Sequence, residues 1–131
     1  MTANLVVSPK HLGELYRVDA RLIAILQAVL SAWPHEQARV TSIFRSPEED
    51  QKLGGSGVHA APPPYRAVDL AGVMPGSVGW EELARIAEAV NADWLYDPGR
   101  PRIHVAVGNR HGTGPHLHLQ VHPRTRRRDE A

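Results

Sequence analysis

The sequence contains no cysteine, which excludes disulfide bonds and thiolate ligands. Any transition metal would therefore have to be held by imidazole and carboxylate groups. No window approaches the roughly 20 consecutive apolar residues that cross a bilayer, and the N-terminus lacks the basic start and apolar stretch of a signal peptide. The 15 Lys and Arg residues nearly balance the 14 Asp and Glu residues, so the net charge does not indicate binding to nucleic acid or to a membrane surface.

What the sequence does contain is eight histidines and a hydrophobic content of 42% in 131 residues. This length and composition fit one domain with a single modest core, which we expect to span residues 1–123. Residues 124–131 are short and charged, and we expect a disordered basic tail. A weak contact with an anionic surface is the alternative role for this tail.

Hydrophobic spacing and turn residues predict the secondary structure. A long amphipathic helix should begin at Ser8 and Pro9 and reach Trp33, and Ser46 and Pro47 should start a short helix. Another helix is expected over about 79–91, and strands are expected over 39–44, 66–72, 102–108 and 116–122, the last two forming a hairpin. These elements predict an α+β fold, a small antiparallel sheet with helices on one face and a cleft on the other.

The strand over 116–122 concentrates polar side chains on one face. Leu117, Leu119 and Val121 alternate with His116, His118, Gln120 and His122. Two imidazoles two residues apart on a strand project in parallel, so a metal ligand and a neighbouring catalytic group could both reach one point above the sheet. An ordinary solvated sheet face is the alternative.

Asp69 lies in "RAVDL", an otherwise apolar strand, where a carboxylate is costly unless it is paired, hydrogen-bonded or bound to a metal. His59 can return to it across the loop that precedes the strand. One carboxylate and two histidines suit zinc, with a fourth position left to water as in catalytic sites. A buried hydrogen bond between Asp69 and His59 without a metal is the alternative.

Three stretches, "VTSIFRSPEED", "SGVHAAPPPYRAVDL" and "HLHLQV", together resemble the zinc D-alanyl-D-alanine peptidases, which are grouped with lysostaphin-like endopeptidases and the hedgehog signalling domain. The resemblance covers roughly residues 38–121. It implies the hedgehog/DD-peptidase fold and the cleavage of peptide bonds in bacterial cell-wall peptides that contain D-amino acids. It also implies that His59, Asp69 and His118 are the ligands of a Zn²⁺ ion.

The resemblance further implies roles for residues around the metal. His116 would accept or shuttle the proton, and Arg45 would face the substrate or the developing oxyanion. Ser56, from the motif that holds His59, and Tyr65 would contact the substrate. For Arg45, a surface ion pair with Glu48 or Glu49 is the alternative.

Two features depart from the family pattern. The family usually places its His and Asp seven positions apart, whereas His59 and Asp69 are ten apart, with "PPPY" as the insertion. Three prolines favour a stiff, extended path, so the longer loop can still bring the two together while Tyr65 shapes a wall of the cleft. Many members also carry Glu or Asp three residues before the last ligand, where this chain has Pro115.

The general base therefore has three candidates. His116 is the first, and Asp97 and His104 are weaker ones. The missing acidic residue also sustains a second hypothesis, a zinc-bearing domain that binds cell-wall fragments or a protein partner without hydrolysis.

The sequence thus predicts a zinc metallopeptidase of the D-Ala-D-Ala carboxypeptidase or endopeptidase type. Its partners would be peptidoglycan stem peptides or D-Ala-D-Ala-like peptides, without nucleic acid or a membrane span, and we expect a monomer. Synthesis in the cytoplasm without a signal peptide fits a phage lysis enzyme, an enzyme carried on a virion, or a dipeptidase acting on wall fragments.

Overall fold

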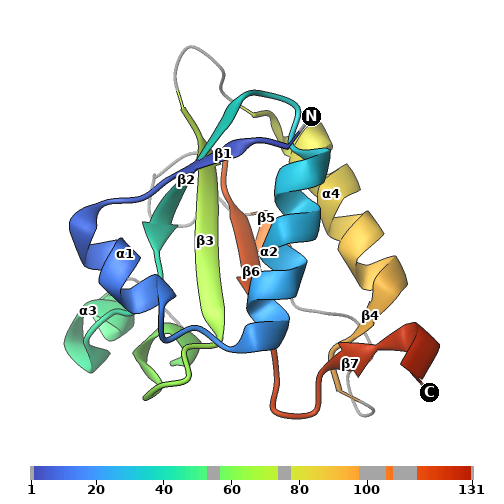
Figure 1. The fold of residues 1–131 in the computed structure, drawn as a ribbon. Helices are drawn as coiled ribbons and strands as arrows, with labels where there is room; N and C mark the ends of the chain where they lie inside the picture. The colour runs from blue at the N-terminus through green and yellow to red at the C-terminus, as the bar shows by residue number, and fades with distance from the viewer. Residues whose placement is uncertain (1, 53–56, 74–77, 98–105, 108–114, 131) are drawn as a thin grey trace.

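Five strands form one sheet through the centre of the molecule (Figure 1). The computed structural model describes residues 2–52, 57–73, 78–97, 106–107 and 115–130. The elements are β1 (Asn4–Val6), α1 (Pro9–Leu15), α2 (Ala20–Ala32), β2 (Gln37–Ser42), α3 (Pro47–Lys52), η1 (Val58–Ala60), β3 (Ala67–Gly72), α4 (Trp80–Asp93), β4 (Trp94–Leu95), β5 (Ala106–Val107), β6 (Leu117–Gln120), β7 (Arg126–Arg127) and η3 (Arg128–Glu130). No helix among these residues is long and apolar enough to cross a membrane.

The strands lie in the order β1, β2, β3, β6, β5. The pairs β2 with β3, β3 with β6, and β5 with β6 are antiparallel, as the sequence predicts, and β5 with β6 matches the expected hairpin over the residues described. The sheet is mixed, because β1, which the sequence pattern did not predict, pairs in parallel with β2. The α+β class is confirmed.

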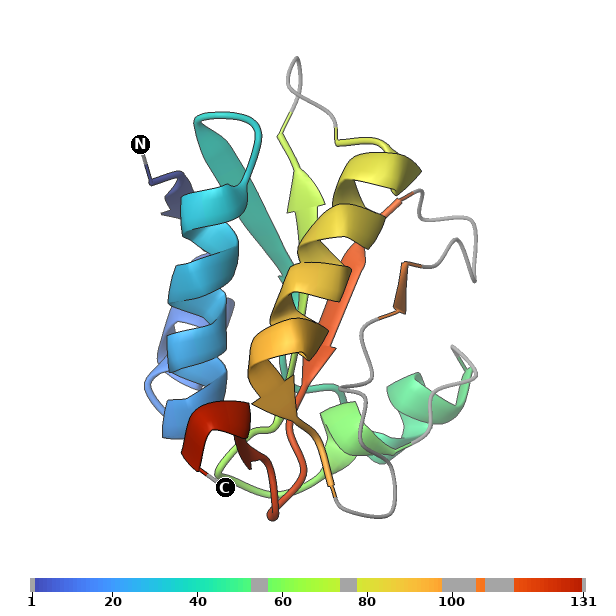
Figure 2. The same ribbon diagram turned by 90° about the vertical axis from the view of Figure 1, so that its right-hand side faces the viewer.

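Helices α2 and α4 lie side by side on one face of the sheet (Figure 2). The core fills the space between them and the sheet, because both helices carry apolar residues at helical spacing and the strands carry them at alternate positions. Leu117, Leu119 and Val121 are all buried, which confirms the predicted apolar face of the last strand. The other face of this strand is left for polar side chains.

The prediction of one long helix from Ser8 to Trp33 is wrong, because this segment forms two separate helices, α1 and α2. The Tyr65 amide donates to the Arg17 carbonyl at 2.9 Å, and the Asp19 amide donates to the Tyr65 carbonyl at 2.8 Å. These bonds take backbone groups that a continuous helix would need for its own ladder. The proline-rich segment before Tyr65 is thereby tied to the link between the two helices.

The sequence predicts disorder for residues 124–131, but the structure differs over residues 124–130, and residue 131 lies outside the described residues. Arg126 and Arg127 pair as β7 with β4, and the Arg127 guanidinium lies 5.4 Å from the centre of the Trp94 ring. Thr125 is buried. A charged sequence therefore forms a short strand here, because β4 offers it an edge and an aromatic side chain to cover.

Asp19 links α2 to this C-terminal segment. Its carboxylate accepts from the Arg21 amide, which caps α2, and from the Arg21 guanidinium at 2.6–2.9 Å. The same guanidinium donates to the carbonyls of Pro123 and Thr125. The hydrogen bond from Arg21 holds the pKa of Asp19 below its ordinary value of 3.8, against the opposing effect of partial burial.

We expect Asp19→Ala to lower the free energy of unfolding by about 1–2 kcal/mol, the usual cost of losing a helix cap. Asp19→Asn should cost less, because asparagine also caps. A depressed pKa stabilises the folded state above the unfolded value, so the difference between wild type and Asp19→Ala should shrink as the pH falls below about 3.8. Urea denaturation at several pH values measures this, and a constant difference down to acid pH would contradict the ion pair.

Candidate metal centre

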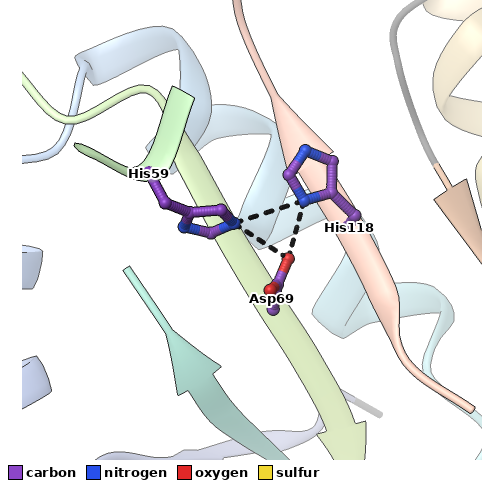
Figure 3. A group of neighbouring side chains, drawn as sticks. All are labelled: His59, Asp69 and His118. Carbon is purple, nitrogen blue, oxygen red and sulfur yellow. Dashed lines mark hydrogen bonds and ion pairs between the residues drawn. The ribbon is translucent and has the colours of Figure 1, made fainter. Parts of the chain in front are cut away.

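Three side chains from three separate segments point toward one another on the polar face of the sheet (Figure 3). His59 comes from η1, Asp69 from β3 and His118 from β6. Each offers one ligand atom, and these atoms all lie within 4.8 Å of one another. The group contains the three residues that the sequence motifs single out as metal ligands.

Strand pairing brings Asp69 and His118 together. In the antiparallel register of β3 and β6 they are direct partners, so their side chains leave the same face of the sheet next to each other. The distance from His118 Nδ1 to Asp69 Oδ1 is 2.7 Å. Asp69 is 7% exposed, so its charge is held largely away from water.

His59 is delivered by a loop that is anchored at two points. Gly57, just before η1, has φ of 95°, a conformation that favours glycine, and its amide donates to Asp50 Oδ2 at 2.9 Å. The Arg45 amide donates to the His59 carbonyl at 3.0 Å. The His59 ring is 2% exposed, and its Nε2 lies 3.3 Å from Asp69 Oδ1 and 3.4 Å from His118 Nδ1.

The backbone fixes the tautomer of His59. Its Nδ1 lies 2.7 Å from the carbonyl oxygen of Ile43. A carbonyl only accepts, so Nδ1 must carry a proton, and the neutral ring then keeps its lone pair on Nε2. That lone pair faces Asp69 and His118. Metal-bound histidines commonly have such a donor bond on the other ring nitrogen.

His118 makes the corresponding bond through a side chain. Its Nε2 lies 2.7 Å from Gln120 Oε1, and Gln120 Nε2 donates to the Tyr96 hydroxyl at 2.6 Å. With Nε2–H as donor, a neutral His118 ring keeps its lone pair on Nδ1, which faces Asp69 and His59. The sequence placed Gln120 on the correct strand face but gave no signal for this bond, because Tyr96 comes from a different segment.

The charges of the group are coupled. Burial raises the pKa of Asp69, but hydrogen bonds and charge interactions with His118 and His59 outweigh burial and hold it well below its ordinary range. Burial lowers the pKa of His118, but the bond to Asp69 and its negative charge outweigh this and raise it. Asp69 thus favours a cation beside it, and the raised pKa of His118 means that protons compete more strongly with a metal ion for this ring.

The donor set fits a zinc ion. Bonds of about 2.0–2.2 Å to nitrogen and carboxylate oxygen in a tetrahedron place the ligand atoms about 3.3–3.6 Å apart. Two of the three separations, 3.3 and 3.4 Å, match this value, and the third, 2.7 Å, is a hydrogen-bond length. Two imidazoles and one carboxylate are also the ligand types of catalytic zinc sites.

Arg45 forms an ion pair with Asp50, which is not one of the partners named in the alternative prediction. Its Nη2 lies 2.9 Å from Asp50 Oδ1, rather than beside Glu48 or Glu49, and the Asp50 side chain is only 4% exposed. The bond from the Arg45 amide to the His59 carbonyl places Arg45 beside the loop that carries His59, and its positive charge acts to lower the pKa of His118. Arg45 Nε is buried, with no hydrogen-bond partner among the described residues.

The remaining predicted site residues are placed less completely. His116 directly precedes β6 and is half-buried. The Tyr65 ring packs against Phe44, with ring centres 5.3 Å apart. Asp97 Oδ1 lies 3.8 Å from His122 Nδ1, whereas Ser56 and His104 lie outside the described residues. Their proposed contacts with substrate or water stay predictions.

No family model matches the sequence, and no curated protein matches it. The fold is similar to the crystal structure of the L-Ala D-Glu endopeptidase ChiX of Serratia marcescens. The two chains are 23% identical, the similarity covers 88% of this chain and 90% of that chain, and the TM-score is 0.48. A similarity of this extent does not by itself assign an activity.

We expect the protein, once stripped with a chelator, to bind about one Zn²⁺ per chain and to melt at a higher temperature with zinc than without. Asp69→Ala and His118→Ala should each weaken binding by more than about 100-fold, because they remove a ligand rather than an outer partner. Competition with a chromophoric chelator measures the affinity. His122→Ala is the matched control, and wild-type affinity in both folded ligand variants would refute this ligand set.

Proposed function

We propose that this protein is a zinc-dependent metallopeptidase that hydrolyses D-amino-acid-containing peptides of bacterial peptidoglycan. The observation that carries the proposal is the convergence of His59 Nε2, Asp69 Oδ1 and His118 Nδ1, in the chain order of the family's motifs. A bare Asp–His hydrogen bond would need one imidazole. The second imidazole and the tautomer fixed by Ile43 favour a metal.

A zinc ion would supply Lewis-acid polarisation of a carbonyl group and activation of a water molecule near neutral pH. The protein would supply the proton transfer and the charge stabilisation. His116, two residues before His118, is our candidate for accepting the proton, because the pKa of an unperturbed imidazole lies near working pH. Arg45 would stabilise negative charge that develops on the carbonyl oxygen.

The ion pair of Arg45 supports this proposed role. The ion pair with Asp50 holds the guanidinium in one place, which limits the reorganisation needed during reaction. Ser56 and Tyr65 are the further residues we propose for contacts with the substrate.

Pro115 sustains a second candidate function. It stands three residues before His118, where many relatives of the family carry an acidic general base. Without a working base, the same metal site would serve a zinc-bearing domain that binds wall fragments or a protein partner without cleavage. Either form would act as a monomer, in phage lysis, on a virion, or on wall fragments inside a cell.

His116→Ala separates the two candidates. We expect this variant to keep its zinc while hydrolysis of peptidoglycan stem peptides falls by roughly 10²–10⁴-fold, the usual effect of losing a general acid–base group. The substrate panel should contain peptides ending in D-Ala-D-Ala and peptides with an L-Ala-D-Glu bond. Wild-type protein that binds wall fragments but cleaves none of them, with zinc present, would favour the non-hydrolytic domain.

Arg45→Ala should lower kcat more than it raises KM, because the proposed interaction forms mainly in the transition state. The variant should also lose up to about 3 kcal/mol of stability, since it leaves the buried Asp50 carboxylate without its partner. Asp50→Asn is the matched control, because it breaks the same ion pair but keeps the guanidinium. Equal loss of kcat in the two folded variants would make the role of Arg45 structural.

A further inference from the structure

Gln120 connects the metal group to the protein interior. It lies on β6, two residues after His118, and is 8% exposed. Its amide has one partner at each end, His118 Nε2 at 2.7 Å from Oε1 and the Tyr96 hydroxyl at 2.6 Å from Nε2. A side-chain amide buried in this way has few other ways to satisfy its donors and acceptor.

The orientation of this amide determines which nitrogen of a neutral His118 is free. In the observed orientation Oε1 accepts from Nε2–H, so the lone pair remains on Nδ1, beside Asp69 and His59. If the amide were reversed, its NH₂ group would donate to Nε2 and the tyrosine hydroxyl to the amide oxygen. The ring proton would then sit on Nδ1, and that nitrogen could not bind a metal.

The partner at the far end of the amide, Tyr96, is also buried. Tyr96 is 5% exposed, and its carbonyl accepts from the Thr125 hydroxyl at 2.7 Å. Thr125 Oγ1 also accepts from the His122 amide at 2.7 Å. The backbone of Tyr96 is thus bonded to the segment that follows β6, and the Gln120 amide lies between the buried Tyr96 and His118.

We propose that Gln120 is a positioning residue that keeps the proton of His118 on Nε2 and so presents Nδ1 to the metal. The inference rests on the metal site of the proposed function, but it concerns how that site is built rather than what it cleaves. Gln120 touches neither the metal nor the substrate. It acts through His118 alone, with Tyr96 as its support.

Two substitutions of Gln120 test the role through metal affinity. Gln120→Leu has similar size but no acceptor, and it should weaken zinc binding by about 10–100-fold, as loss of such outer partners does. Gln120→Glu should bind zinc at least as tightly as wild type, because a carboxylate only accepts and leaves Nε2–H as the sole arrangement. If both variants lose the same affinity, or neither loses any, the proposal is wrong.

A spectroscopic measurement reads the ring nitrogen directly. Protein labelled with ¹⁵N in its histidines and loaded with ¹¹³Cd²⁺ should show cadmium coupling to Nδ1 of His118 and to Nε2 of His59. The same pattern is expected for Gln120→Glu. Coupling to Nε2 of His118 in wild-type protein would overturn the inference, and so would the absence of metal binding.

Thr125→Val is the matched control for general damage to this region. It removes two buried hydrogen bonds beside Tyr96 but leaves the Gln120 amide and both of its partners. Its stability should fall while the zinc affinity of the folded protein stays at the wild-type value. A loss of affinity equal to that of Gln120→Leu would show that the effect is not specific to Gln120.

The inference and the proposed function can fail separately. If the metal results are as expected but the protein hydrolyses no peptide, the proposed function is rejected and the inference stands.

Discussion

The pairing of β3 with β6 is the constraint on which the candidate site depends. Its register sets Asp69 opposite His118, and the same register places Leu70 and Leu117 on the core face under α2 and α4. A slip of one residue would send the apolar side chains into water and the polar group into the core. The packing of the core and the assembly of the candidate metal centre are therefore specified by the same set of backbone hydrogen bonds.

Around this pair, the protein controls where lone pairs point. The carbonyl of Ile43 holds the His59 proton on Nδ1, and the amide of Gln120 accepts from His118 Nε2. Three acceptors then face one another with no donor between them, which is unfavourable unless a cation or a proton lies there. The short contact between Asp69 and His118 is consistent with the proton, and the longer contacts of His59 are consistent with the cation.

The sequence predicts the parts of this structure that depend on local pattern. Alternation along residues 116–122 identifies the buried and polar faces of β6, and the type and order of His59, Asp69 and His118 single out three side chains that the fold brings together. Contacts between distant segments are not readable in this way. Tyr65 forms backbone hydrogen bonds with Arg17 and Asp19, and these bonds interrupt the long helix that the sequence predicts. Arg45 forms its ion pair with the buried Asp50, rather than with Glu48 or Glu49, which are nearer in the sequence.

The two histidines present different ring nitrogens, and this gives them different reach. Nδ1 of His118 is as many bonds from its Cα as the carboxylate oxygen of an aspartate is. Nε2 of His59 is one bond further from its Cα, like the carboxylate oxygen of a glutamate. Position 118, on a strand beside Asp69, therefore suits a short ligand, and position 59, on a loop across the site, suits a long one. During divergence, the ligand types open to each position would be those that keep its length: aspartate at 118 and glutamate at 59, but not the reverse.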